Sequence, residues 1–347
     1  MHKKIIILHI LPRLYGGGAE KIHNLLYQKL SKDFVQLRLV IFDKNSYIDL
    51  LKFVLYRHKN HKKILFGWMY YGGLLAFIIS YLTPISGQII SLHSLLDKRL
   101  EGLPVKISRK LIKIFLPFKK VVFTYPNKIS MSQHLLDGFP KNKSIVVKNG
   151  IFLEEDLEIK STKSNYEKVF KIGVLGRNNR YKNLELAINA FLAFHYSTKS
   201  TAKIYLKGDK VDLLSKYISK DQENLIFLDS NTNNVDVFFK EINLLIVPSI
   251  CECSPLVIPE AIFSGTRVIS TPTADAYRLI GNFGTITDDF EISSMVSAIK
   301  KEYNLFSRNK KIHKKNYFIS MKTHSYKVSN LNKMSSEFKK IILKLTR

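Results

Sequence analysis

Two carboxylates, Glu252 and Glu260, stand eight positions apart in the stretch of this 347-residue chain that is best suited to binding a polar ligand. A short apolar strand is expected over residues 244–247, and Gly265 is expected to end a helix that carries Glu260 in its first turn. Ligands of open α/β sheets bind at the carboxyl ends of strands, where loop amides donate to anions or hydroxyl groups. We therefore expect hydroxyl recognition rather than metal binding here, and a surface loop with a capping glutamate is the alternative.

Arg177 and Lys182 form a second cluster, directly after an expected strand over residues 170–175. A guanidinium group offers phosphate oxygens a planar fork, and an ammonium group offers them a point charge. The pair suits a diphosphate, and a solvated basic loop is the alternative.

Gly16, Gly17 and Gly18 lie between an expected strand at residues 4–10 and an expected helix at 19–30. Glycines allow a close approach of the backbone to a ligand and leave amides exposed at a helix N-terminus. The spacing is neither Gly-x-Gly-x-x-Gly nor a Walker loop, and a tight turn is the alternative.

Short apolar runs alternate with helical patterns along the chain. This alternation predicts doubly wound parallel sheets, whose strands and helices would position these residues. In the first half, further strands are expected at 35–42, 88–92, 120–124 and 144–147, with helices at 68–81, 106–115 and 129–136. In the second half, further strands are expected at 203–207, 225–228 and 267–270, with a helix at 184–196 and one or two amphipathic helices in 325–345. Residues 152–166 are the candidate linker. The predicted domains are 1–160 and 161–325, followed by a helical tail at 326–347.

Residues 64–96 contain no Asp, Glu, Lys or Arg, and their first part, 64–82, approaches membrane-spanning length. The alternative is a buried helix at 68–82, a turn at 84–87 and a strand from 88. Glycines and tyrosines in the run favour the second interpretation.

The charge balance is strongly basic, with 55 Lys and Arg against 28 Asp and Glu and a net charge of +27. Residues 1–150 hold 25 basic and 7 acidic side chains, so the first domain is the more basic.

Residues 98–120 hold eight basic residues and one acid, Glu101. Ile107, Leu111, Ile114 and Phe115 share one helical face there, as in a helix that lies on an anionic membrane. An ordinary amphipathic helix packed on a sheet is the alternative. The basic residues are Lys98, Arg99, Lys106, Arg109, Lys110, Lys113, Lys119 and Lys120.

An apolar fraction of 46% excludes a disordered chain. Cys251 and Cys253 can form neither a disulfide framework nor a four-ligand zinc site, which fits a reducing compartment. The basic, apolar N-terminus has no cleavage site and is expected to be a strand rather than an export signal. We expect a cytoplasmic protein.

The chain as a whole resembles the family 4 (group 1) retaining glycosyltransferases of the GT-B fold. The resemblance implies two Rossmann-like parallel-sheet domains with a cleft between them, an N-terminal acceptor-binding domain and a C-terminal nucleotide-sugar-binding domain. The segments that carry it are Gly17-Gly18-Ala19-Glu20, Gly67-Trp68-Met69-Tyr70, Leu92-His93-Ser94, Lys148-Asn149-Gly150, Gly176-Arg177 with Lys182, Pro248-Ser249, Glu252 with Glu260, and Ala274-Asp275-Ala276 through Gly284.

The resemblance also implies roles for single residues. Arg177 and Lys182 would hold the donor diphosphate, Glu260 the ribose, and Glu252 the donor sugar. Gly17 and Gly18 would approach the phosphate or the acceptor, and His93 would reach the reacting centre. The loop residues expected to line the donor site beside Glu252 are Cys253, Ser254, Leu256 and Val257. The family usually has glycine where this chain has Cys253, and Pro255 and Pro259 remove two amide donors from the loop.

The expected reaction is transfer of a hexose or N-acetylhexosamine from a nucleotide sugar, a UDP-sugar, to a lipid-linked saccharide in surface polysaccharide synthesis. The resemblance implies retention of the anomeric configuration and a reaction without a bound metal or other cofactor. Because no carboxylate nucleophile is evident, front-side displacement is the expected mechanism. The expected partners are the nucleotide sugar, the lipid-linked acceptor and the anionic inner face of the cell membrane. A nucleotide-sugar epimerase of the same fold and a basic nucleic-acid-binding protein are the alternatives, but no nucleic-acid-binding motif supports the second.

Overall fold

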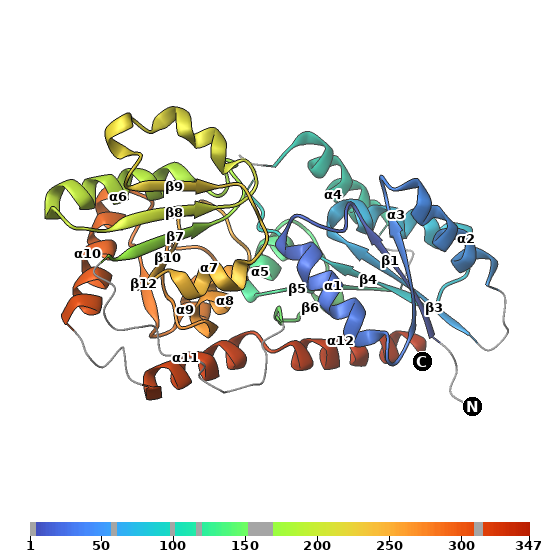
Figure 1. Ribbon diagram of the computed structural model, residues 1–347. Helices are drawn as coiled ribbons and strands as arrows, with labels where there is room; N and C mark the ends of the chain where they lie inside the picture. Colours follow the sequence, from blue (N-terminus) through green and yellow to red (C-terminus); the bar gives the residue numbers. More distant parts are fainter. Residues whose placement is uncertain (1–4, 57–60, 98–100, 116–119, 152–168, 309–314) are drawn as a thin grey trace. The chain divides into compact units, whose positions relative to one another are not determined.

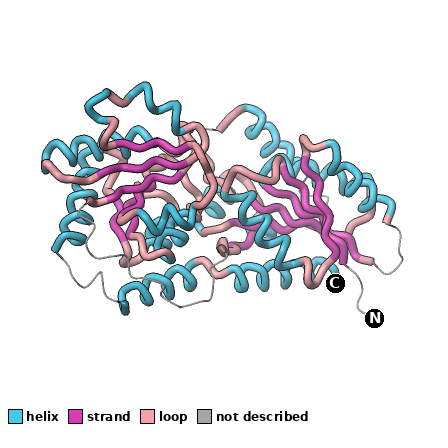
Figure 2. The backbone as a smooth tube through the Cα atoms, viewed as in Figure 1, coloured by secondary structure: helices cyan, strands magenta, loops and turns pink. Residues whose placement is uncertain are grey.

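The computed structural model describes residues 5–56, 61–97, 101–115, 120–151, 169–308 and 315–347. The chain forms two compact units, Met1–Phe152 with Asn330–Arg347, and Leu153–Ser329. Each unit contains one six-stranded parallel sheet with helices packed on it (Figures 1 and 2). The predicted α/β class with two doubly wound sheets is therefore confirmed. The linker expected at 152–166 and the domain boundary at 160 lie outside the described residues.

Unit 1 has the strand order β2-β1-β3-β4-β5-β6. Its strands are β1 (Ile5–Leu11), β2 (Val35–Val40), β3 (Lys62–Trp68), β4 (Gly87–Ser91), β5 (Val121–Tyr125) and β6 (Ser144–Val146). Its helices are α1 (Gly18–Leu30), α2 (Tyr47–Leu55), α3 (Met69–Leu82), α4 (Leu103–Phe115), α5 (Lys128–Leu136) and α12 (Leu331–Thr346), with short 3₁₀ turns η1 (Lys44–Ser46) and η3 (Lys141–Lys143). Strand β3 and helix α2 were not predicted.

Helices cover the two faces of this sheet unequally. Helices α2 and α3 share an apolar core with one face of β1 and β3, and α3 shares a second core with α4 and β5. On the opposite face, Phe338 of α12 packs against Phe66 of β3, with ring centroids 5.3 Å apart. Alternate residues of β3 therefore point to different helical layers.

The long apolar run at 64–82 is divided between a strand and a helix. Strand β3 ends at Trp68, and α3 begins at the next residue, Met69, whose φ of +59° turns the chain. A Cβ atom on Gly72 would lie 2.3 Å from the carbonyl oxygen of Ile10, so glycine lets α3 pack closely on β1. None of the helices in the described ranges combines the length and apolar character needed to cross a bilayer.

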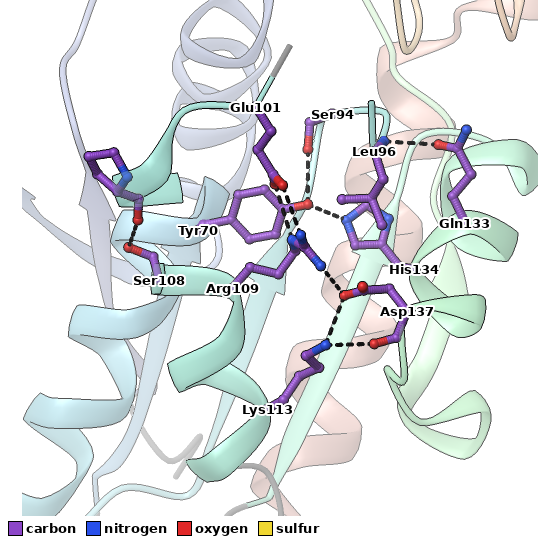
Figure 3. A network of polar contacts seen from close by, with 11 residues as sticks. Tyr70, Ser94, Leu96, Glu101, Ser108, Arg109, Lys113, Gln133, His134 and Asp137 are labelled. Carbon is purple, nitrogen blue, oxygen red and sulfur yellow. Dashed lines mark hydrogen bonds and ion pairs between the residues drawn. The ribbon is translucent and has the colours of Figure 1, made fainter. Parts of the chain in front are cut away.

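Two of the basic residues expected to face a membrane are used inside unit 1 instead (Figure 3). Arg109 is buried and forms ion pairs with Glu101 and Asp137, and Lys113 contacts Asp137 at 3.0 Å. Burial alone would raise the pKa of Asp137, but hydrogen bonds from both cations outweigh it and lower that pKa. The prediction that Arg109 and Lys113 flank a membrane-binding face is therefore wrong, because acids from two neighbouring segments pair with them. Lys98, Arg99 and Lys119 lie outside the described residues.

Unit 2 has the strand order β12-β11-β10-β7-β8-β9. Its strands are β7 (Lys171–Leu175), β8 (Lys203–Lys207), β9 (Ile226–Asp229), β10 (Leu244–Val247), β11 (Arg267–Ser270) and β12 (Gly284–Ile286). Its helices are α6 (Leu184–Thr198), α7 (Val235–Glu241), α8 (Val257–Phe263), α9 (Ala276–Ile280), α10 (Ile292–Arg308) and α11 (Lys315–Val328), with 3₁₀ turns η4 (Val211–Tyr217) and η5 (Lys220–Gln222).

The C-terminal segment is divided between the units. Helix α11 packs on unit 2, where Ser325 Oγ donates to the carbonyl oxygen of Pro259 at 2.7 Å. Helix α12 belongs to unit 1, where Ile151 and Asn330 form a parallel bridge. A Cβ atom on Gly150 would lie 2.5 Å from Leu331 Cα, so this junction requires glycine.

Unit 1 should lose stability in mild acid. Burial lowers the pKa values of His9, His23, His93 and His134 from 6.5 to about 3, 2, 4 and 4 respectively. Below pH 6.5 the unfolded chain then binds more protons than the folded chain. The free energy of unfolding is therefore not reduced by these histidines above that pH, and it falls as the pH drops toward 4. The slope reaches about 1.4 kcal/mol per pH unit for each histidine. Fluorescence of Trp68, the only tryptophan, can follow urea unfolding of unit 1. Equal urea midpoints at pH 7 and pH 5 would contradict this.

Candidate functional site

The carboxyl edge of the second sheet has a topological switch point. Strand β7 pairs with β8 on one side and with β10 on the other, so the chain leaves β7 in one direction and later returns to its opposite side. Loops that follow two such strands diverge and leave space for a ligand. Arg177 and Lys182 follow β7, and the stretch from Glu252 to Glu260 follows β10.

A backbone hydrogen bond joins these two loops. The amide of Ile250 donates to the carbonyl of Tyr181 at 2.8 Å. Next to it, Nζ of Lys182 forms an ion pair with Oε1 of Glu252, and Ser249 Oγ donates to the same oxygen at 3.2 Å. The side chains of Lys182 and Glu252 keep 27% and 17% of their surface exposed. Both charges therefore remain accessible to a polar ligand.

The other predicted residues of unit 2 lie around this pair. Arg177 is half-buried two residues after β7, and Glu260 is half-buried in the first turn of α8, as the sequence predicts. Cys253 is buried and does not adopt a left-handed backbone, so the conformation of this loop does not require a glycine at this position. Ser254 Oγ donates to Asp275 Oδ2 at 3.0 Å. Leu256 is buried just before α8, and Val257 is half-buried at its first residue.

The loop after β8 was missed by the sequence analysis. Gly208 has φ +147°, and a Cβ atom there would lie 2.1 Å from the carbonyl oxygen of Gly176. The amide of Asn178 donates to the carbonyl of Asp209 at 2.9 Å. These contacts fix the backbone on both sides of Arg177. A glycine directly after a predicted strand is the signal that could have identified this position.

The first sheet has its switch point between β1 and β3. Gly17 is the N-cap of α1 with extended backbone, and Gly18 begins the helix. Gly16 has φ +99° and open space around its Cα, so only this glycine of the three has a backbone that other residues rarely adopt. Arg13 Nε donates to Glu20 Oε1 at 2.8 Å across the loop.

His93 follows β4, beside the end of β3. Its ring stacks on the indole of Trp68, with centroids 5.4 Å apart and planes 16° apart. Its amide donates to Sδ of Met69 at 3.4 Å, and its Nε2 lies 2.8 Å from Ser91 Oγ. Trp68 in turn donates from Nε1 to His9 Nδ1 at 3.3 Å. The imidazole of His93 is therefore held from several directions.

A buried polar network fixes the loop that follows His93 (Figure 3). Ser130 Oγ donates to the carbonyl of Ser94 at 2.7 Å, and the amide of Leu96 donates to Gln133 Oε1 at 3.0 Å. His134 accepts a hydrogen bond from the hydroxyl of Tyr70 at 2.6 Å, because its Nδ1 donates to the carbonyl of Ser130. Helix α5 and Tyr70 thus fix the backbone of the loop that follows His93.

The predicted site residues therefore gather at two sheet edges. The structure brings Lys182 and Glu252 into contact in unit 2, with Arg177 and Glu260 on the same pair of loops. Gly17, Gly18 and His93 belong to unit 1. Among the residues with described positions, no group of three or more His, Cys, Asp or Glu side chains could hold a metal ion.

Comparisons with known proteins agree with this architecture. Residues 169–304 match the family model "Glycosyl transferases group 1". The structure of Anabaena Alr3699/HepE in complex with UDP-glucose is similar, with a TM-score of 0.76, 13% sequence identity, and coverage of 98% of this chain and 99% of that chain. A glycosyltransferase from Rickettsia africae has a TM-score of 0.68 and 15% identity, with both chains fully covered.

WaaG, a glycosyltransferase involved in lipopolysaccharide biosynthesis, has a TM-score of 0.69 and 12% identity, with 97% of this chain and 99% of that chain covered. No protein with a curated description matches the sequence significantly. Assignment to family 4 in particular stays a prediction. The chain has the GT-B fold, and the resemblance to the group 1 glycosyltransferases is confirmed by the match over residues 169–304 of its second unit.

Proposed function

We propose that this protein is a retaining, metal-independent glycosyltransferase that moves a hexose or N-acetylhexosamine from a UDP-sugar to a lipid-linked saccharide acceptor in surface polysaccharide synthesis. The group 1 match of unit 2 supports sugar transfer. Similar structures were solved with UDP and with UDP-glucose, which supports a UDP-sugar donor, and WaaG acts in lipopolysaccharide biosynthesis. No mechanism or acceptor is inherited from these proteins at 12–13% identity.

The contact between Lys182 and Glu252 carries the proposal. A sugar diphosphate presents anionic oxygens and hydroxyl groups within a few ångströms of each other. An ammonium group beside a carboxylate offers both recognition chemistries at that separation, because the cation binds phosphate and the carboxylate accepts from hydroxyls. Arg177 adds a second cation, and Glu260 adds an acceptor for the ribose hydroxyls.

Front-side displacement is the mechanism that these residues support best. The departing UDP accepts the proton of the acceptor hydroxyl while Arg177 and Lys182 stabilise its growing charge. The acceptor oxygen forms its bond to the anomeric carbon on the face that UDP leaves, so the configuration is retained. Glu252 already accepts from Lys182 and Ser249, which suits a binding group better than a free nucleophile.

The Arg177→Ala variant should lose about 10²- to 10³-fold in kcat, because one charge-stabilising donor is removed from the leaving group. UDP release measures turnover. Arg180→Ala is the matched control, since Arg180 is exposed in the same loop, and it should keep wild-type turnover. Near-normal turnover of Arg177→Ala would reject the assignment, and full loss of wild-type activity in EDTA would reject metal independence.

A thermal-shift screen tests the donor and separates the alternatives. A nucleotide sugar at 100 times its dissociation constant should stabilise the fold by about 2.7 kcal/mol. Stabilisation by a UDP-sugar followed by transfer supports the proposal. Conversion of the sugar without acceptor would indicate the epimerase, and salt-sensitive binding of any DNA duplex without UDP binding would indicate the nucleic-acid-binding alternative.

We also propose that unit 1 binds the anionic cytoplasmic face of the cell membrane, where a lipid-linked acceptor would lie. Large exposed hydrophobic residues gather on one helical layer of this unit, whereas on the described parts of α1 and α12 only Leu343 is of this kind. Large apolar side chains exposed together on one layer favour an interaction surface. They are Phe42 in the turn after β2, Tyr47, Ile48, Leu51 and Leu55 on α2, Tyr71, Ile78, Tyr81 and Leu82 on α3, and Leu103, Ile107 and Ile114 on α4.

The charges of this layer favour anionic lipid over a second copy of the chain. Lys106 and Lys110 lie beside Ile107 on α4, and neither has an ion-pair partner among the described residues. The nearby acids Glu101 and Asp137 are already paired with Arg109 and Lys113. A symmetric dimer would bring uncompensated lysines together, whereas phospholipid head groups would neutralise them at about 1 kcal/mol for each cation.

Lys106→Glu/Lys110→Glu should abolish flotation with anionic phosphatidylglycerol vesicles at low salt, because it reverses the charge beside the apolar face. The matched control is Lys340→Glu/Lys344→Glu on α12, which makes the same change in net charge on the opposite helical layer and should float normally. Ile107→Asp should also reduce flotation while leaving UDP binding intact. Absence of wild-type flotation at low salt would remove the membrane proposal.

A further inference from the structure

Lys182 and a buried serine bind the same oxygen of Glu252 in unit 2. Nζ of Lys182 pairs with Oε1 of Glu252, and Ser249 Oγ donates to that oxygen at 3.2 Å. Among the residues with described positions, none donates a hydrogen bond to the other carboxylate oxygen, Oε2. Because the side chain is partly exposed, its carboxylate can still accept hydrogen bonds from hydroxyl groups of a ligand.

The fold fixes both partners of this ion pair close to their charged ends. Ser249 is fully buried two residues after β10, and its carbonyl accepts from Thr271 Oγ1 at 2.5 Å. The methylene stem of Lys182 lies against Gly176, where a Cβ atom would be 3.4 Å from Lys182 Cδ. The carboxylate of Glu252 therefore stays beside the ammonium group when a ligand binds to that group.

This carboxylate acts on a nucleotide in two opposite ways. A diphosphate that binds Nζ of Lys182 lies close to Glu252, and negative charges at so short a distance repel each other. The hydroxyl groups of a sugar, in contrast, donate to a carboxylate and form charge-assisted hydrogen bonds. A nucleotide sugar meets both effects, whereas UDP meets only the repulsion.

The two cations of the site would by themselves favour the product of the proposed reaction. A terminal phosphate loses its second proton at about pH 6, so UDP is more negative at neutral pH than a UDP-sugar. Arg177 and Lys182 would therefore hold UDP more tightly than the donor. A carboxylate beside Lys182 opposes this preference.

We infer that Glu252 selects the intact nucleotide sugar over the product UDP, and that Ser249 positions the carboxylate for this selection. The inference rests on the proposed function and deepens the account of its donor site. Hydrogen bonds from the sugar offset the repulsion while the donor is bound, and they are lost once the sugar is transferred. Release of UDP is thereby promoted. Ser249 is a positioning residue, because it acts on the nucleotide only through Glu252.

Isothermal titration calorimetry tests the selection without any acceptor. The probes are UDP and either UDP-glucose or UDP-N-acetylglucosamine, whichever binds more tightly to the wild type. Glu252→Gln keeps the size of the side chain and removes its charge. This variant should bind UDP at least about fivefold more tightly, since like charges about 4 Å apart repel even in water. It should bind the UDP-sugar no more tightly than the wild type, because weaker hydrogen bonds to the sugar offset the lost repulsion.

The ratio of the two dissociation constants separates selection from a general loss of structure. Ser249→Ala should shift this ratio in the same direction as Glu252→Gln, by a smaller factor. Glu223→Gln is the matched control, because it makes the same change in charge in an exposed turn before β9, at the opposite edge of the sheet, and it should keep the wild-type ratio. An unchanged ratio in Glu252→Gln, with both probes still bound, would overturn the inference and leave the proposed function intact. Failure of the wild type to bind UDP or any UDP-sugar would defeat the proposed function itself.

Discussion

The geometry of unit 2 depends on one constraint of parallel sheets, which is that neighbouring strands end at the same edge however far apart they lie in the chain. Strands β7 and β10 are neighbours, although some seventy residues separate Lys182 from Glu252. The bond between Ile250 and Tyr181 turns this adjacency into a fixed contact between two loops. Without this fixed contact, a partly exposed ion pair would add little stability, because ordering the flexible lysine side chain costs conformational entropy.

The carboxyl edge of the sheet in unit 1 has a different chemical character, because its side chains are mostly uncharged. Although it is the more basic half of the chain, the residues around His93 are neutral, namely Trp68, Met69 and Ser91. Burial keeps the histidines uncharged, and hydroxyl and indole groups orient them. The basic side chains of this unit lie elsewhere, and two of them are paired with acids between α4 and α5. Net charge alone therefore did not locate the candidate site.

The sequence predicted the strands and helices better than the contacts that their side chains make. The alternation of apolar runs and helical patterns placed nearly every strand of both sheets, and it placed Glu260 in the first turn of α8. Strand β3 was missed because its apolar residues run on into α3 without a polar break. The pairing of Arg109 was missed because its partner Asp137 is distant in sequence. Periodicity shows that a helix has an apolar face, but it does not show which surface that face meets.

A division of chemistry between the two edges follows from these environments. The exposed cation and carboxylate of unit 2 suit ligands whose charge is already present, because their own charges cost little to keep in water. The buried imidazole of His93 stays uncharged near neutral pH, so the carboxyl edge of unit 1 offers hydrogen bonds and aromatic surface rather than charge.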